Sequence, residues 1–395
     1  MTDQGQVSNG IIAFVASLRR ELRHWRCDRW EWVLVTLLPL LLMAVMAWLF
    51  SGSVLREVPV ALVDLDASPA SRALARAIDA SPGVKIVSQP ASLQQAQSEL
   101  RALDAFAIVL VPRDMSRLAL RGQAAPVYAF YNATYMATGQ SAARDIADAV
   151  GAHNARMLRE QIGRQVGPAK LRAAPVSVQA TVLYNPARSY ELFLLPLVFP
   201  ALLSLLAALA AGGAFGRERR DGTLAGWLGE TPWAAIAGKL FPYVALFSLY
   251  GALGVLYVAD VRGDGVAGSL WLLLFAQPLF YLACVCIALL LIAVTRDMGA
   301  GLSLIGLSIG TALAFSGATF PVIGAPLFVR AWNALLPLTA YVQVQMQQLF
   351  MGSPWVVSLR PLGVLMLMAL VAGGAGVLLL VRVARKSVDT ERVPA

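Results

Sequence analysis

The residues best suited to chemistry are few in this sequence. Its 395 residues include only two histidines, His24 and His153, and the topology predicted below puts them on opposite sides of a membrane. A His-rich metal site is therefore excluded, and a Ser-His-Asp triad in the domain that carries His153 could use only that histidine. His153 lies among polar residues of a predicted helix, so we interpret it as a surface or packing residue.

Three cysteines add little to this inventory. Cys284 and Cys286 are two residues apart in a predicted membrane-spanning helix, so their thiols point in different directions. With no histidine or third thiol near them, they do not form a typical metal site. The third cysteine is Cys27, near the N-terminus. The large polar region between the first two apolar stretches contains no cysteine. That region must be stable by packing and not by disulfides.

The chain also lacks a nucleotide-binding loop. Its only Gly-Lys pair, Gly238-Lys239, is followed by Leu240, and the glycine that a Walker A motif needs five positions earlier is absent. We therefore expect no metal and no cofactor in this chain and no enzymatic activity. Any energy from ATP would have to come from another chain.

Composition indicates that lipid is the solvent for much of the protein. The mean hydropathy is +0.66, and 58% of residues are hydrophobic against 14% charged. Six apolar stretches approach or exceed the roughly 20 residues that a helix needs to cross a membrane. They are Trp32–Phe50, Leu192–Phe215, Leu240–Val258, Leu270–Val294, Gly299–Thr319 and Leu362–Val381. The sequence therefore predicts six transmembrane helices.

Basic residues in the connections predict the orientation, because they are retained on the cytoplasmic side. One side collects many of them: Arg19, Arg20, Arg23, Arg26, Arg29, Arg217, Arg219, Arg220, Lys239, Arg296, Arg382, Arg385, Lys386 and Arg392. Short loops on the other side hold only Arg262, Arg330 and Arg360. Both termini are thus predicted to be cytoplasmic. The net charge of +9 reflects this topology and calls for no nucleic-acid partner.

The N-terminal segment, residues 1–31, is predicted to be a cytoplasmic amphipathic helix at the membrane surface. Its apolar face consists of Ile11, Val15, Leu18, Leu22 and Trp25, which recur at spacings of four and three. Packing of the same face on a partner protein is the alternative. The first span, residues 32–50, is too long for a cleaved signal and lacks a small-residue cleavage site, so we expect a retained anchor.

A water-soluble α/β domain is predicted for residues 51–189, on the outer side of the membrane. Short apolar strands, such as Val58–Asp64 and Phe106–Val111, alternate there with helical stretches such as Ser68–Ala80 and Thr138–Gly163. A last strand, Val176–Tyr184, would lead back to the membrane. Residues 190–381 would then form transmembrane helices two to six, with residues 382–395 as a cytoplasmic tail.

Two connections within the membrane part stand out. Residues 216–239 form the longest cytoplasmic connection, and residues 320–360 are only moderately hydrophobic and are broken by prolines, including Pro321 and Pro337. Prolines at such spacing predict short half-helices that re-enter the outer leaflet and not a seventh span.

The fifth predicted span carries small and polar residues that lipid alone would not favour. Gly299, Ser303, Gly306 and Gly310 fall on one helical face, and small residues there let two helices approach closely. Packing within the chain, a subunit interface and a substrate path are all compatible with this pattern.

Four local patterns, in order along the chain, resemble permease subunits of ABC-2 exporters that carry an extracytoplasmic domain after the first span. They are Pro59-Val60-Ala61-Leu62-Val63-Asp64 with Ser68-Pro69-Ala70-Ser71-Arg72; Tyr184-Asn185-Pro186 with Phe193 and Pro196; Arg217-Glu218-Arg219-Arg220-Asp221-Gly222-Thr223-Leu224 with Thr231-Pro232; and Ser316-Gly317, Phe320-Pro321 and Leu336-Pro337-Leu338-Thr339-Ala340-Tyr341. The resemblance covers nearly the whole length.

This resemblance implies a non-catalytic transporter subunit in a bacterial inner membrane. Two permeases, either two copies or a copy and a paralogue, would pair and engage cytoplasmic ABC ATPases that bind ATP and Mg²⁺. The coupling element would be the 216–239 connection, through Arg217, Glu218, Gly222, Thr223, Leu224, Trp227 and Leu228. The arginines and Glu218 would offer charged contacts, and Leu224, Trp227 and Leu228 would offer an apolar edge for the ATPase groove. A solvated loop is the plain alternative.

The resemblance implies further roles. The second and fifth spans would line a central path, which makes Ser204, Ser308 and Thr311 candidate path residues, and Pro321, Pro337 and Tyr341 would belong to the outer re-entrant region. One departure is that Ala225 stands where the family usually has an acidic residue after Gly-Thr-Leu. The absence of charge clusters along the path favours an amphipathic or drug-like substrate, taken from the cytoplasm or inner leaflet.

Two questions of function stay open at this point. In a cell with two membranes, the size and position of the outer domain make it the candidate docking site for a periplasmic adaptor protein. A membrane receptor or scaffold, whose outer domain binds a ligand and which transports nothing, is the alternative from another class. Such a receptor would need no ATPase-coupling loop.

Overall fold

The structure, a computed structural model, describes residues 3–51, 57–120, 126–131, 136–164, 189–263, 265–295, 297–319, 322 and 324–391. The chain divides into two compact units, a helical unit of Met1–Ser51 with Val182–Ala395 and a second unit of Gly52–Thr181. The predicted strand Val176–Tyr184 and the predicted membrane re-entry at Tyr184–Pro186 lie outside the described residues, as do Pro321 and Arg296.

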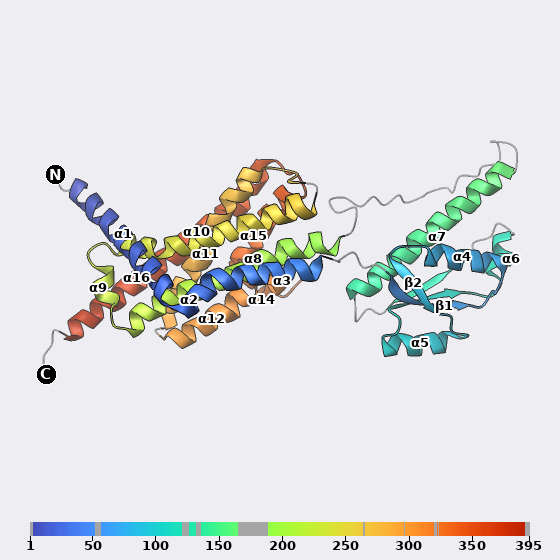
Figure 1. Ribbon diagram of the computed structural model, residues 1–395, viewed down its shortest axis with the longest axis horizontal. Coiled ribbons are helices and arrows are strands. Elements are labelled where there is room, and N and C mark those ends of the chain that lie inside the picture. The colour runs from blue at the N-terminus through green and yellow to red at the C-terminus, as the bar shows by residue number, and fades with distance from the viewer. Residues whose placement is uncertain are drawn as a thin grey trace. The chain divides into compact units, whose positions relative to one another are not determined.

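Within the described residues, six helical segments are long and apolar enough to cross a membrane, which is the predicted number. They are Arg29–Phe50, Glu191–Arg220, Pro232–Arg262, Leu270–Thr295, Met298–Phe315 and Trp355–Arg385. An even number of spans returns the chain to the side from which it started. The start of α1 and the end of α16 lie at the same end of the helical unit, on the left in Figure 1.

The helical unit consists of the elements before and after the second unit in the chain. In chain order they are α1 (Asp3–Cys27), α2 (Arg29–Trp32), a π-helical turn η1 (Val33–Leu37), α3 (Leu38–Phe50), α8 (Tyr190–Arg220), α9 (Leu224–Leu228), α10 (Pro232–Leu256) with a π-helical turn η4 (Tyr257–Arg262), α11 (Leu270–Thr295), α12 (Met298–Gly310), α13 (Ala312–Phe315), α14 (Leu327–Leu335), α15 (Pro337–Leu349) and α16 (Trp355–Glu391). The first span is thus α2, η1 and α3 in succession.

Helix α11 lies at the centre of the helical unit and packs along α16 through small residues. A Cβ added to Gly376 of α16 would lie 2.9 Å from the side chain of Leu289, and one added to Gly373 would lie 3.0 Å from the Sγ atom of Cys286. Cys284 and Cys286 are both buried among apolar side chains. Their surroundings are those of small apolar core residues.

The small-residue face predicted on the fifth span is not the face that α12 uses for packing inside the chain. Gly299, Ser303 and Gly310 are exposed, and nothing lies within 4 Å of a Cβ added to Gly306. Instead, Gly301, Ile305 and Ile309 are buried. Packing within the chain is therefore the wrong explanation for the small-residue face, which lies open on the helical unit.

The region predicted to re-enter the membrane contains α14 and α15, two short helices with different surroundings. No residue of α14 is buried, whereas most of α15 is. Asn333 of α14 donates from Nδ2 to the carbonyl oxygen of Phe315 at 2.5 Å and to Thr339 Oγ1 of α15 at 3.2 Å. These bonds fix the corner between the two helices, and their depth in a membrane stays a prediction.

The second unit is a four-stranded sheet with helices on both faces. Its strands are β1 (Val58–Asp64), β2 (Val84–Ser88), β3 (Ala107–Val111) and β4 (Tyr128–Tyr131), in the spatial order β2-β1-β3-β4, with only β4 antiparallel. Its helices are α4 (Pro69–Asp79), α5 (Leu93–Ala102), α6 (Met115–Leu120) and α7 (Met136–Arg164). The strands and helices predicted for residues 58–163 are present within one or two residues of the expected bounds.

Alternation along β1 explains the layers of this unit. Val58, Val60 and Leu62 face a core shared with α4 and α7, while Ala61 and Val63 face a smaller core with α5. Successive strand residues point to opposite faces of a sheet, so a strand that is apolar throughout must be covered on both sides. Figure 1 shows α4 and α7 on one side of the sheet and α5 on the other. The unit is therefore a small α/β domain, inserted in the sequence between the first and second candidate spans.

The face through which helix α1 packs along α10 shares Trp25 with the predicted apolar face, but not Ile11 or Leu22. Ser17, Glu21 and Trp25 are buried, whereas Ile11 and Leu22 are exposed. Close approach of the two helices depends on Gly238 of α10. A Cβ at that position would lie 2.3 Å from the carbonyl oxygen of Phe14, a backbone atom that cannot rotate away.

We expect Gly238→Ala to push α1 off α10 and to lower the stability of the helical unit by about 1–3 kcal/mol, because the added methyl group overlaps backbone. Thermal unfolding of the purified chain in detergent measures this. Gly363→Ala in α16 is the matched control, because nothing lies within 4 Å of its added Cβ. Equal melting temperatures for the two variants would contradict the close approach.

Candidate functional site: a buried charged junction beside helix α1

Ionised side chains from four helices meet where α1 crosses α8 and α10. We call this set of residues the charged junction. Its members are Glu21 of α1, Glu31 of α2, Arg217 and Glu218 of α8, and Lys239 and Tyr243 of α10. Except for Arg217, which is half-buried, their side chains are almost entirely enclosed. Charges this deeply enclosed are costly unless each finds a partner.

Lys239 is the central cation of the charged junction. Its Nζ atom lies 2.7 Å from Glu21 Oε2 and 2.9 Å from Glu218 Oε1, so one ammonium group joins α1 to α8. Nζ also lies 5.1 Å from the centre of the Trp227 ring, within the range of a cation–π contact. The side chain is only 2% exposed, so the two carboxylates replace the water that it loses.

Arg217 and Tyr243 complete the charged junction on its other side. Arg217 Nη2 donates to Glu21 Oε1 at 2.8 Å, and Nη1 pairs with Glu31. The Tyr243 hydroxyl lies 2.6 Å from Glu21 Oε1 and 2.8 Å from Glu31 Oε1, and it accepts a bond from Trp25 Nε1 at 3.1 Å. Two carboxylates of the N-terminal segment are thus held by residues that follow it by roughly two hundred positions.

Electrostatics keep Glu21 ionised in this enclosed place. Burial alone would raise the pKa of Glu21, but the charges of Lys239 and Arg217 and the hydrogen bonds from Lys239 and Tyr243 hold it below its ordinary value. A carboxyl whose pKa is lowered on folding stabilises the folded state at neutral pH. That contribution is lost as the pH falls through the lowered pKa.

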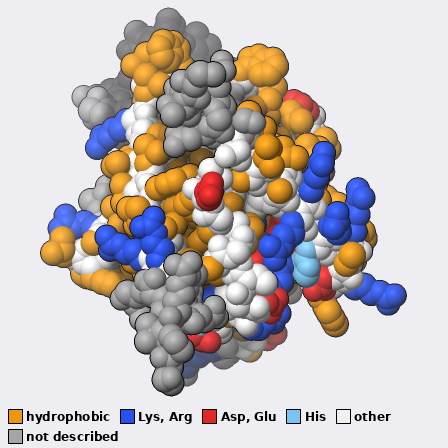
Figure 2. Space-filling view, turned by 90° about the vertical axis from the view of Figure 1, so that its left-hand side faces the viewer, with side chains coloured by type: hydrophobic (Ala, Val, Ile, Leu, Met, Phe, Trp, Pro, Cys, Tyr) orange, Lys and Arg blue, Asp and Glu red, His pale blue; other side chains and the backbone are white. Residues whose placement is uncertain are grey.

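Glu218 also reaches the solvent-facing edge through Arg20. Arg20 Nη2 lies 2.9 Å from Glu218 Oε2, and the Thr223 hydroxyl donates to the same oxygen. Arg20 is about half exposed, so this pair marks the rim of the charged junction. Figure 2 shows the molecule from the end where α1 and α9 lie, with lysine and arginine side chains gathered at several places around the face and acidic ones among them.

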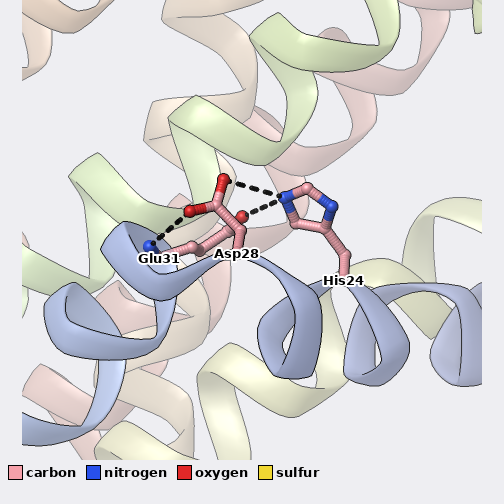
Figure 3. Close-up of side chains that lie close together, drawn as sticks. All are labelled: His24, Asp28 and Glu31. Carbon is pink, nitrogen blue, oxygen red and sulfur yellow. Dashed lines mark hydrogen bonds and ion pairs between the residues drawn. The ribbon is translucent and has the colours of Figure 1, made fainter.

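A cluster with the ligand types for a metal lies next to the charged junction. His24 Nε2 lies 2.6 Å from Glu31 Oε2 and 3.7 Å from Asp28 Oδ2 (Figure 3). One atom from each residue falls within 4.8 Å of the others. However, Asp28 Oδ1 already caps α2 through the amides of Trp30 and Glu31, and Glu31 also pairs with Arg217. We therefore interpret the cluster as part of the ion-pair network.

The predicted ATPase-coupling residues divide into buried and exposed ones. Leu224 and Leu228 are only 6% and 4% exposed, and they pack in the core of the chain itself. Trp227 is half-buried, and its Nε1 donates to Ser17 Oγ of α1 at 2.8 Å. The expected apolar edge is therefore wrong as a free surface, because α9 folds back onto its own helical unit.

The charged members of that set are also engaged inside the chain. Arg217 and Glu218 belong to the charged junction, and Thr223 bonds to Glu218, which leaves Gly222 as the turn residue. Gly222 has φ +69°, a conformation that favours glycine, and it is exposed. Arg220 and Asp221, which precede Gly222, are also exposed, and so is Trp233 at the start of α10.

The predicted path residues satisfy their hydroxyls within their own helices. Ser204 Oγ donates to the carbonyl oxygen of Ala201 at 2.9 Å, Ser308 Oγ to that of Leu304 at 2.7 Å, and Thr311 Oγ1 to that of Leu307 at 2.8 Å. Such bonds let hydroxyls sit in an apolar environment at low cost. Ser204 is buried, whereas Ser308 lines an apolar cavity.

That cavity has a volume of about 490 Å³ and lies between α11, α12, α14, α15 and α16. Ser308, Trp332, Pro337 and Ala372 are among its lining residues, and most of the others are leucine, isoleucine, valine and methionine. Its size falls in the range of small-molecule sites, about 300–1,000 Å³. Of the three predicted path residues, Ser308 alone lines this cavity.

The other predicted residues are distributed as follows. Val15 and Leu18 are half-buried against the chain, Ile11 and Leu22 are exposed, and Trp25 is buried in the charged junction. Trp25 therefore does not share a lipid-facing surface with the rest of the predicted apolar face. Pro337 and Tyr341 are buried in α15, and Pro321 lies outside the described residues.

Sequence reasoning missed Glu21, Glu31 and Lys239 as members of one cluster. One signal was present. Lys239 stands at the start of an apolar stretch, and an ionisable residue in such a place needs a named partner. Spacing along the chain identifies no partner, because the carboxylates come from the segment before the first span and from the end of the second.

A second ion pair joins helices elsewhere in the unit. Arg262, at the end of η4, donates from Nε to Glu191 Oε1 at 2.6 Å and from Nη2 to the carbonyl oxygen of Ser51 at 2.7 Å. Glu191 is buried at the start of α8. The end of the first span, the start of the second and the end of the third are thereby tied together.

These features define a class first: a multi-span membrane protein whose ionised groups are enclosed at the ends of its helices, with a small α/β domain inserted in its sequence. Comparison with known families then gives the identity. Residues 29–378 match the model of the ABC-2 family transporter proteins, and the chain belongs to that family.

Two curated relatives are similar over part of their length. Proteins named "Probable multidrug ABC transporter permease YbhS", from Escherichia coli strain K12 and from Escherichia coli O157:H7, are each 26% identical to this chain over 180 residues. The match covers 45% of this chain and 48% of each relative, so the chain spans about half the length of the curated relatives it matches.

Replacing Lys239 by Met is expected to destabilise the helical unit by about 3–5 kcal/mol, because Glu21 and Glu218 would remain buried without their shared cation. Thermal unfolding in detergent measures the loss. Adding Glu218→Gln to Lys239→Met removes one uncompensated charge, so the double variant should recover part of the lost stability. Arg220→Met, which breaks an exposed pair with Asp221, should stay within about 0.5 kcal/mol of wild type. A loss as small for Lys239→Met would contradict the charged junction.

Proposed function

We propose that the chain is the membrane-spanning permease subunit of an ATP-driven exporter in a bacterial inner membrane. Both termini and the charged junction would face the cytoplasm, and the α/β unit would lie on the outer side. Membership of the ABC-2 family across residues 29–378 is the observation that carries the proposal. The asymmetric distribution of arginine and lysine supports the orientation.

The energy for transport would come from a separate cytoplasmic ATPase that binds ATP and Mg²⁺, and the permease would work beside a second copy or a paralogue. The open small-residue face of α12, with Gly306 and Gly310, suits close contact with a second permease. A periplasmic adaptor would be a further partner of the α/β unit. The size of the α/β unit and its predicted outer position support this partner.

The charged junction gives this proposal a mechanical basis. An ATPase that docks at the turn around Gly222 and at Trp233 would contact residues that lead directly into α8 and α10. Lys239 ties α10 to α8 through Glu218 and to α1 through Glu21. A push on this end would therefore move α1, α8 and α10 together, because their charged groups cannot separate without losing their partners.

The apolar cavity supports a substrate that is apolar or amphipathic. Its roughly 490 Å³ would hold a drug-sized molecule or part of a lipid, and Ser308 offers a hydroxyl among apolar walls. The relatives named as multidrug permeases agree with a substrate of this kind.

ATPase docking can be tested by affinity purification from native membranes through a tag on the C-terminal tail. With wild type, we expect a cytoplasmic ATPase to co-purify; with Trp233→Ala combined with Arg220→Glu, its recovery should fall about tenfold, equivalent to about 1.4 kcal/mol. These side chains are exposed, so the fold should persist. Trp271→Ala, at the start of α11 and 81% exposed, is the control. If no ATPase is recovered with wild type under any mild detergent, the receptor alternative takes precedence.

Filling the apolar cavity tests the substrate path. Ala372 is buried and lines the cavity, so Ala372→Trp should occupy much of its volume and reduce efflux of apolar fluorescent compounds about tenfold, equivalent to about 1.4 kcal/mol of binding. ATPase recovery should be unchanged. Leu370→Trp is the control, because Leu370 lies two residues away on the exposed side of α16. Unchanged efflux by a folded Ala372→Trp variant would exclude this cavity from the path.

A further inference from the structure

Among the described residues of α11 and α15, three buried polar groups have no hydrogen-bond partner. They are Gln277 Oε1 and Tyr281 Oη of α11 and Gln345 Oε1 of α15. The residues are at most 2% exposed, and all three lie far from the charged junction in sequence. Buried polar groups in native proteins are nearly always bonded, so each orphaned one calls for an explanation such as a bound water or ligand.

All three residues line one small cavity between α8, α10, α11 and α15. Its volume is about 10 Å³, the space open to the centre of a water-sized sphere, which is about what one water molecule requires. Tyr341 of α15 and Gly251 of α10 line the same cavity. The space is too small for an organic substrate, and it is distinct from the apolar cavity beside Ser308.

The donors and acceptors that line this small cavity indicate which molecule fits it. Gln277 Nε2 donates to Tyr341 Oη at 2.6 Å, so the amide of Gln277 is oriented with its oxygen left to accept. The cavity thus offers two amide oxygens that can only accept and one tyrosine hydroxyl that can donate. A water molecule donates two hydrogen bonds and accepts others, which complements this set. A metal cation would gain no carboxylate from the residues that line the cavity.

Neighbouring backbone supports the same assignment. Pro196 and Pro200 of α8 also line the cavity. Because Pro200 has no N–H, the carbonyl of Pro196 lacks its usual helical partner. Gly251 leaves the room that the polar groups occupy. A Cβ there would lie 2.2 Å from Gln277 Oε1 and 2.9 Å from Tyr281 Oη.

We propose that this cavity holds one ordered water molecule that bridges Gln277 Oε1, Gln345 Oε1 and Tyr281 Oη and so joins α15 to α11. The site does not depend on the proposed transport function. It adds a second polar attachment between α15 and α11 beside the direct hydrogen bond from Gln277 to Tyr341. A water-mediated hydrogen bond is nearly as favourable in enthalpy as a direct one, so one water can satisfy all three buried groups.

The direct test is a structure of the wild-type chain in lipid nanodiscs, with its native partners, at a resolution that shows ordered water. We expect one density peak within hydrogen-bond distance of all three groups. An empty cavity in which the two glutamine side chains bond directly to each other would overturn the proposal. So would density that responds to exchange of the monovalent cation in the buffer.

A mutant cycle provides a second readout on the same chain. Gln277→Leu and Gln345→Leu should each lower the melting temperature, because each leaves the other glutamine and Tyr281 with an incomplete set of bonds. The double variant should lose less than the sum of the single variants, and the water peak should be absent from it. Gln343→Leu, an exposed glutamine on α15, is the matched control and should unfold like wild type. Strictly additive losses would overturn the bridge.

Discussion

Lys239 is held in the interior of the helical unit by Glu21 on one side and Glu218 on the other, and the position of α1 depends on this arrangement. An ammonium group at that depth cannot be hydrated, and removing Lys239 would leave two buried carboxylates without the cation that they share. The pairing therefore fixes which face of α1 turns inward. It also explains why a helix with exposed isoleucines at its start, Ile11 and Ile12, buries a glutamate further along.

Much of the architecture follows from composition and periodicity alone. Uninterrupted apolar stretches identify the spans because a helix in lipid satisfies its own backbone, and the alternating strands and helices of residues 58–163 identify the α/β unit. Both signals are local, so a single sequence carries them. The short helix α6 was not expected, since Met115–Leu120 is too short to show a helical period.

The candidate site was harder to predict, for a physical reason. Leu224 and Leu228 look like a contact surface because the connection that carries them is polar and reads as exposed, yet α9 turns back and buries both. Likewise, Trp25 continues an apolar face in sequence, while its indole N–H is drawn inward by Tyr243. Burial in these cases is set by contacts between segments far apart in the chain, which neither spacing nor hydropathy reports. The small-residue face of α12 shows the opposite error, because a motif for close packing faces outward.

The sequence distance across the charged junction has a consequence for biosynthesis. Glu21 and Lys239 are separated by 218 residues, and the whole α/β unit is made between them. A nascent chain therefore anchors its first span while Glu21 and Glu31 still lack Lys239, Tyr243 and Arg217. Until the third span leaves the ribosome, Glu21 lacks Lys239 and Tyr243 and can pair only with Arg217 of α8. Closure of the charged junction is thus a late, long-range step of assembly, and it can signal that the first three spans have been inserted in the correct order.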